Sequence, residues 1–211
     1  MFPFDAEVLA SSYALYNAAV WPAQVFALAL ALAAVWLSVS PRRGGLRVIG
    51  AVLAAGWLWC GLVFFPRHLA QLDFMAPVYG WVFAAQAALL LWALVWRPAA
   101  LRAAPGIAGV AALALAAAAI FGLPLVSGVG EAGFAAARIV GLAPGPTVLF
   151  TLALLLLVEG RAPRLLSAIP LLWCGVAAVT GWVLGVPESL ALAVLALPAF
   201  GLLLWPARRP A

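Results

Sequence analysis

The chain of 211 residues contains no lysine, one histidine, two cysteines and two methionines. Without lysine it cannot hold retinal or pyridoxal phosphate as a Schiff base. His68 alone cannot supply the paired axial ligands of a membrane b-type haem. The few sulfur and imidazole groups do not make up a zinc or copper site either. We therefore expect no cofactor and no metal.

Charged residues are also scarce, at 8% of the chain against 68% hydrophobic residues. This composition excludes a soluble globular domain and provides apolar sequence for about seven bilayer crossings of about 20 residues each. Turn-rich or charged pieces separate the apolar runs, so we predict an all-α integral membrane protein. Residues 1–20 are expected to form an interfacial segment and residues 206–211 a cytoplasmic tail. The seven transmembrane helices are predicted near residues 21–39, 46–65, 77–96, 106–126, 146–158, 165–183 and 188–205.

The arginines are distributed unevenly among the loops between these spans. Nine of the eleven follow spans one, three and five or lie at the C-terminus, whereas Arg67 and Arg138 fall on the other side with five of the six acidic residues. The positive-inside rule then predicts an inner-membrane protein with its N-terminus outside and its C-terminus in the cytoplasm. Because topology accounts for the net charge of +5, we expect no nucleic-acid partner.

Both cysteines lie in the same tetrapeptide, LWCG, at residues 58–61 in span two and 172–175 in span six. Shorter matches around them, in the same order, suggest a parallel repeat of three spans, a linker span and three spans. This 3+1+3 plan resembles that of SWEET-type sugar transporters. The likeness is one of topology only, and no residue role follows from it.

The fifth span has only 13 apolar residues, about 20 Å as a helix against a hydrocarbon core of about 30 Å. Its start at Gly141–Thr147 should therefore lie below the outer surface. Irregular backbone at that depth needs surrounding protein or a water-filled cavity, so we expect a pocket beside Gly145 and Thr147. The alternative is a short helix preceded by a surface loop, with local thinning of the bilayer.

Polar and aromatic side chains on the predicted outer side are the other candidate ligands. We expect Arg67 and the helix start at Thr147 to contact polar or anionic groups, and Gln86, near mid-membrane, and Asn17 to form hydrogen bonds. Apolar walls are expected from Trp21, Trp57 and Trp81. The further candidates are Gln24, His68, Asp73, Tyr79 and Arg138.

Each of these residues has a structural alternative. Arg67 would then extend to the interface rather than bind an anionic group or pair with Asp73, and His68 would be an interfacial residue rather than a group that titrates near neutral pH. Gln86 would join two helices by a hydrogen bond, and most tryptophans would form aromatic belts.

Three functions are compatible with these residues. The first is binding or translocation of a small solute through an outward-facing pocket, with the lipid bilayer and that solute as partners. The second is a non-transporting accessory or sensory subunit, in which the small residues of span four contact a partner membrane subunit or a second copy. The third is a membrane-embedded enzyme acting on lipid, which would need His68 within hydrogen-bond reach of Asp73. No catalytic residue is assigned, since the serines lack a nucleophile-elbow context.

Four strings carry a resemblance along most of the chain: YNAAVWPAQ (residues 16–24), FFPRHLAQLDFMAPVYGWVFAAQ (64–86), GLAPGPTVLF (141–150) and IPLLWCG…LGVPESL (169–190). They resemble an uncharacterised, domain-of-unknown-function family of small bacterial multi-pass membrane proteins. The pattern of that family has a cysteine between the two prolines, where this chain has Gly145. This departure argues against thiol or metal chemistry in the loop, and the resemblance implies no activity.

Overall fold

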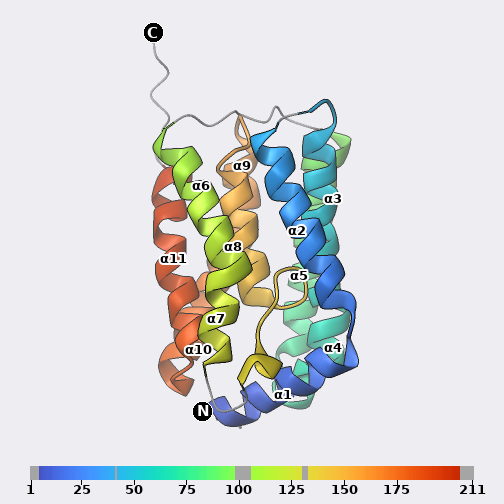
Figure 1. The fold of residues 1–211 in the computed structure, drawn as a ribbon, viewed down its shortest axis with the longest axis vertical. Helices are drawn as coiled ribbons and strands as arrows, with labels where there is room; N and C mark the ends of the chain where they lie inside the picture. The colour runs from blue at the N-terminus through green and yellow to red at the C-terminus, as the bar shows by residue number, and fades with distance from the viewer. Residues whose placement is uncertain (1–4, 41, 98–105, 130–132, 205–211) are drawn as a thin grey trace.

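A computed structural model describes residues 5–40, 42–97, 106–129 and 133–204 as a bundle of helices, with no β-strand among them (Figure 1). The predicted tail, 206–211, lies outside the described residues. The all-α class predicted from the sequence is confirmed.

The chain begins with a bent pair of helices. Helix α1 (Ala6–Ala19) starts where the Asp5 carboxylate accepts a hydrogen bond from the Val8 N–H at 2.9 Å. It lies across one end of the bundle, and α2 (Ala23–Val39) turns from it by 90° and runs along the bundle (Figure 1).

Three longer helical stretches follow, and each contains a π-helical piece. The first comprises α3 (Gly45–Trp59), η1 (Cys60–Phe64), α4 (Phe65–Arg67) and η2 (Leu69–Gln71). The second comprises α5 (Ala76–Leu90) and η3 (Leu91–Trp96), and the third α6 (Ile107–Ala117), η4 (Ala118–Gly122) and α7 (Leu123–Gly128).

All three π-helical pieces end two residues before a proline in the sequence, namely Pro66, Pro98 and Pro124. A proline has no N–H and its ring crowds the carbonyl four residues earlier, so the preceding turn widens.

The last part of the chain contains η5 (Gly133–Ala136), α8 (Pro144–Leu155), α9 (Ala162–Leu166), α10 (Ala168–Leu184) and α11 (Pro187–Leu204). Each of the seven predicted apolar segments thus contains a helix. By length and composition, four helical stretches are able to cross a membrane: Gly45–Gln71, Ala76–Trp96, Ile107–Gly128 and Ala162–Leu184. The bent pair α1–α2 brings the number to five if it counts as one span, whereas α8 and α11 are shorter apolar helices.

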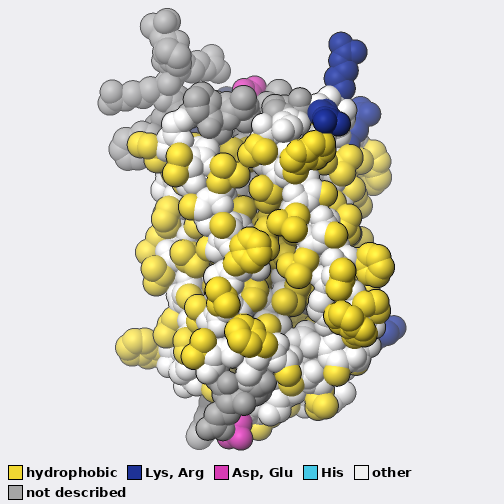
Figure 2. All heavy atoms as spheres, in the orientation of Figure 1, with side chains coloured by type: hydrophobic (Ala, Val, Ile, Leu, Met, Phe, Trp, Pro, Cys, Tyr) yellow, Lys and Arg dark blue, Asp and Glu magenta, His cyan; other side chains and the backbone are white. Residues whose placement is uncertain are grey.

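The surface has the polarity of a membrane protein. Figure 2 shows hydrophobic side chains over the middle of the molecule and the visible charged side chains toward its two ends. Large side chains exposed on this surface include Phe26 (66%), Val110 (70%) and Trp182 (83%). Apolar area of this extent would be costly in water and is favourable against lipid.

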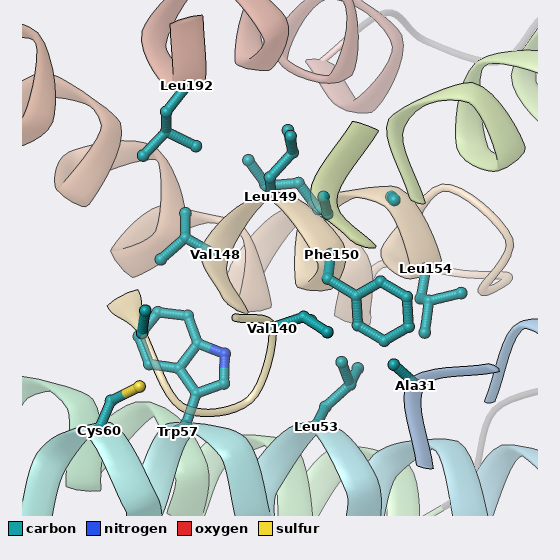
Figure 3. Packing of buried hydrophobic residues seen from close by; sticks show 14 of the residues in the cluster. Ala31, Leu53, Trp57, Cys60, Val140, Val148, Leu149, Phe150, Leu154 and Leu192 are labelled. Carbon is teal, nitrogen blue, oxygen red and sulfur yellow. The ribbon is translucent and has the colours of Figure 1, made fainter. Parts of the chain in front are cut away.

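Helix α8 lies in the centre of the bundle. Every residue from Pro146 to Leu155 is buried, and α3, α6, α10 and α11 pack around it. Figure 3 shows Val148, Leu149, Phe150 and Leu154 of this helix among side chains from its neighbours. A helix that is apolar on all sides is stable only where every side meets protein or lipid, and here every side meets protein.

The two halves of the predicted repeat are packed differently. Helix α2, which corresponds to α8, lies on the outside, with Val25 and Phe26 more than half exposed. In the first LWCG segment Gly61 faces Gly80 of α5 so closely that an added Cβ would lie 2.8 Å from its carbonyl oxygen, whereas a Cβ on Gly175 meets nothing within 4 Å. The matching tetrapeptides therefore occupy different environments.

The Gly61–Gly80 contact leads to a direct test. Gly61→Ala should lower the free energy of unfolding by about 1–3 kcal/mol, because neither backbone can move without disturbing the packing of α3 on α5. Gly175→Ala is the matched control and should be neutral or stabilising by up to about 1 kcal/mol. Unfolding in detergent measures both variants, and equal effects would contradict the described packing.

Candidate functional site

The residues before α8 form an irregular segment inside the bundle. In Figure 1 the chain rises from the α1 end to about the middle of the bundle before α8 begins. Residues 136–138, Val140, Leu142 and Ala143 are buried. Of the two alternatives for span five, the structure shows the buried one: a twelve-residue helix preceded by irregular backbone within the protein.

Side chains of α1 and α8 satisfy the backbone of this segment. The Tyr16 hydroxyl donates to the Leu142 carbonyl at 2.9 Å, and the Asn17 amide donates to the carbonyls of Ala135 and Ala137 at 2.7 and 2.8 Å. The Thr147 hydroxyl accepts from the Gly141 N–H at 2.8 Å and donates to the Ala143 carbonyl. Asn17 and Thr147, both candidate ligands, thus hold the segment in place.

The N-terminus of α8 has few free donors. Its first three residues are Pro144, Gly145 and Pro146, so only Gly145 has an N–H there. None of the described hydrogen bonds uses that N–H, and the Thr147 N–H already donates to Ala143. The helix end therefore offers one free N–H and the partial charge of the helix dipole.

A buried ion pair lies beside this helix end. Arg138, on the irregular segment, donates through Nη1 to the Glu188 carboxylate and to the Ser189 hydroxyl, the latter at 3.3 Å. Its guanidinium carbon lies 4.5 Å from the centre of the Tyr13 ring. The side chains of Arg138 and Glu188 are 10% and 2% exposed.

Glu188 also lies between two helix N-termini. It belongs to the first turn of α11, and its Oε1 is so close to Gly145 of α8 that an added Cβ would lie 2.5 Å from it. Both helix dipoles favour a negative charge at this position. Oε1 is buried and has no hydrogen-bond partner among the described residues.

A cavity of about 80 Å³ opens beside the ion pair, toward the α1 end of the bundle. Such a volume holds several water molecules. Its polar lining comes from Tyr13, Asp73, Tyr79, Arg138, Thr180, Glu188 and Ser189, and aromatic walls come from Phe64, Phe65 and Trp173.

Four of the predicted ligands line this cavity: Asp73, Tyr79, Arg138 and Gly145. The Asp73 carboxylate is largely buried and accepts from the Met75 N–H at 2.8 Å, which places it at the start of α5.

Three further candidates lie within the packing and away from the cavity: Trp57 and Gln86 are buried, and Gln24 is half-buried. Trp57 donates to the Thr151 hydroxyl at 2.8 Å, and the Gln86 amide donates to the Leu166 carbonyl at 2.8 Å, which joins α5 to α9. Gln24 donates to the Asn17 carbonyl at 2.7 Å. Their described contacts are those of structural residues.

Trp21, Arg67 and His68 lie together in a second place, an open groove of about 640 Å³ between the α1–α2 turn and the end of α3 and α4. The His68 ring packs edge-on against Tyr16 at 4.6 Å. Trp81 is 75% exposed on α5 and lines neither the groove nor the cavity.

The described residues form neither the His68–Asp73 pair of a lipid-hydrolysing enzyme nor a metal site. His68 and Asp73 share no hydrogen bond or ion pair, so the pair that a lipid-hydrolysing enzyme would need is not formed. Within the ranges that the structure describes, no group of three or more His, Cys, Asp or Glu residues is placed to hold a metal ion.

The sequence interpretation missed Glu188, Ser189, Tyr13, Trp173 and Thr180. Glu188 was counted only as an acidic residue on the predicted outer side, because it is the first residue of the seventh apolar run. The one available signal was its position directly after Pro187, where an acidic residue favours the first turn of a helix.

The helices and the apolar surface define a class: an α-helical membrane protein with a small polar cavity at one end of the bundle. Within that class, the chain belongs to a family of unknown function (DUF6064), whose sequence model matches residues 6–211. This confirms the resemblance drawn from the sequence strings. No curated protein and no solved structure matches the chain significantly.

The ion pair leads to a second test. Arg138→Gln or Glu188→Gln should each lower the free energy of unfolding by about 3–5 kcal/mol, since each leaves a buried charge without its partner. The double variant should lose clearly less than the sum of the two, and Arg67→Gln, at an exposed arginine without an ion pair, should change stability by no more than about 0.5 kcal/mol. Unfolding measured in the same detergent would contradict the pairing if the two effects were additive.

Proposed function

We propose that this protein is a multi-pass protein of the bacterial inner membrane that binds or carries a small polar solute in an outward-facing cavity. The observation that carries this proposal is the cavity beside the N-terminus of α8, together with the buried, unpaired Oε1 of Glu188. A buried carboxylate oxygen without a hydrogen bond costs about 1–3 kcal/mol or more, and a bound solute with a donor group removes that cost.

Seven crossings are the topology that best suits the helices. Helix α8 is about 18 Å long, and the buried segment before it covers the remaining depth. Helices α2 and α11, with 17 and 18 residues, are near the lower limit of about 17–25 residues for a tilted crossing.

Charge supports the orientation. Arg42, Arg43 and Arg47 lie at the α2–α3 turn, at the end of the bundle opposite α1, and Arg97, Arg161 and Arg164 follow the helices that end there. With that end in the cytoplasm, the cavity faces outward.

The cavity lies near α1, at the end of the bundle that we propose to be the outer one. Beyond Gly145, toward the arginine-rich end, α8 is packed on every side, so the described state is closed to the cytoplasm. Carriage of the solute across the membrane would require α8 or its neighbours to move, as alternating access does.

The accessory-subunit alternative has weaker support. Some small residues of span four, Gly109, Ala112 and Ala116, are buried, and α6 packs against α8 of the same chain. The exposed side of α6 carries Ala114 and Ala117 together with larger residues such as Ile107 and Val110, which suit lipid.

Solute binding is tested with a cysteine in the cavity wall. Thr180→Cys in the purified protein should react with methyl methanethiosulfonate at least about tenfold faster than the wild-type chain, whose two cysteines are buried. At least one of three small probes, methylammonium, acetate or glycerol, should slow this reaction. Absence of reaction at Thr180→Cys, or absence of protection by every probe, would contradict the proposal.

Orientation is tested separately on intact cells with a membrane-impermeant maleimide. Glu7→Cys, exposed on α1, should be labelled, whereas Arg43→Cys, exposed at the opposite end, should be labelled only after lysis. The reverse pattern would place the cavity on the cytoplasmic side.

A further inference from the structure

The N-terminus of α8, where an anion would bind, is already occupied by a carboxylate of the same chain. The Glu188 carboxylate faces Gly145 at the helix N-terminus, and its side chain is 2% exposed. The prolines on either side of Gly145 have no N–H to offer a second anion. An anionic solute would therefore meet a fixed negative charge, with the Gly145 N–H as the single free backbone donor of this helix end among the described residues.

Arg138 does not reverse this balance. Its described contacts are with Glu188, Ser189 and the Tyr13 ring, all groups of the same chain. The charged residues that line the cavity are Asp73, Arg138 and Glu188, that is, two carboxylates and one guanidinium, with a formal sum of −1.

The cavity has carboxylate acceptors beside the hydroxyl groups of Tyr13, Tyr79, Thr180 and Ser189, which can donate or accept. Oε1 of Glu188 is buried without a partner. Asp73 uses one carboxylate oxygen to accept from the Met75 N–H, and none of the described hydrogen bonds uses the other. Two carboxylates, one from the loop before α5 and one from the first turn of α11, thus line one small space, each with an oxygen that no described group bonds.

Aromatic rings form the apolar part of the cavity wall. Trp173 packs edge to face against Phe65 and Tyr79, with ring centres 5.4 and 5.3 Å apart, and all three line the cavity. Aromatic faces attract cations within about 6 Å, especially where water is largely excluded. Carboxylates combined with such rings select positively charged groups.

We propose that the solute is a small cation with N–H donors, namely ammonium or a short primary alkylammonium such as methylammonium. This inference rests on the proposed function and names its substrate class. The volume of about 80 Å³ admits only a few non-hydrogen atoms. The N–H groups of the cation donate to the free Asp73 oxygen, and its charge balances the lining of the cavity.

The test compares how four salts or solutes protect Thr180→Cys from methyl methanethiosulfonate, with the purified protein at constant ionic strength. Methylammonium chloride should give half-protection at a concentration at least about tenfold below that of sodium chloride, sodium acetate or glycerol. Acetate or glycerol protecting as well as methylammonium overturns the cation class and leaves the proposed function standing. Equal protection by sodium chloride overturns the requirement for N–H donors, and protection by none of the four overturns both proposals.

Two further variants in the Thr180→Cys background identify the acceptor. Asp73→Asn keeps an oxygen for the Met75 N–H but removes the charge, so half-protection by methylammonium should need about tenfold more of it. Glu159→Gln removes an exposed carboxylate near the end of the bundle opposite α1 and should leave protection unchanged. Unchanged protection in Asp73→Asn, with the protein folded, would overturn the proposal.

Discussion

The structure depends on one constraint: a short apolar helix, α8, that is surrounded by protein on every side. Its twelve residues give about 18 Å of helix against a hydrocarbon core of about 30 Å. In the proposed seven-span topology the missing depth is covered by backbone that is not helical, and such backbone is stable in a membrane only when protein encloses it and supplies its hydrogen bonds. Helix α1 meets part of this need, since it lies across the end of the bundle and donates from Tyr16 and Asn17 to that backbone.

The site follows from the same constraint. Because α8 begins in the interior, the first turns of α8 and α11 come together there with Arg138 of the irregular segment. A buried ion pair contributes little net stability, because removing its charges from water costs about as much as their attraction returns. The Arg138–Glu188 pair instead fixes the position of the irregular segment against α11. It leaves one Glu188 oxygen unpaired near the cavity.

The sequence predicted the features that depend on local composition. The apolar runs gave the positions of the seven helical segments, and the shortage of apolar residues in the fifth led to the buried segment at Gly141–Thr147. Composition cannot distinguish a helix surrounded by protein from one that faces lipid, since both are apolar. For that reason the central place of α8 was not predicted, and the repeat suggested an equivalence between α2 and α8 that the packing does not have.

The site residues that could be predicted are likewise those that local sequence indicates, and the ones missed depend on packing between helices. Asp73, Tyr79, Arg138 and Gly145 were found because they lie on the predicted outer side near the short span. Glu188 was missed because its burial depends on where α11 packs against α8, a contact between residues 43 positions apart in the chain. Gln86 and Trp57 were expected at the site as unusual residues within a span, but their partners lie on neighbouring helices.

The central claim is that the cavity at the start of α8 selects a small cation. A crystal structure of the protein soaked in methylammonium bromide tests it most directly, because the cation appears as new density in the cavity and bromide gives its own anomalous signal. The account predicts methylammonium density in the cavity within reach of Asp73 and no bromide there. A bromide peak beside Gly145, or a cavity without methylammonium density, would contradict it.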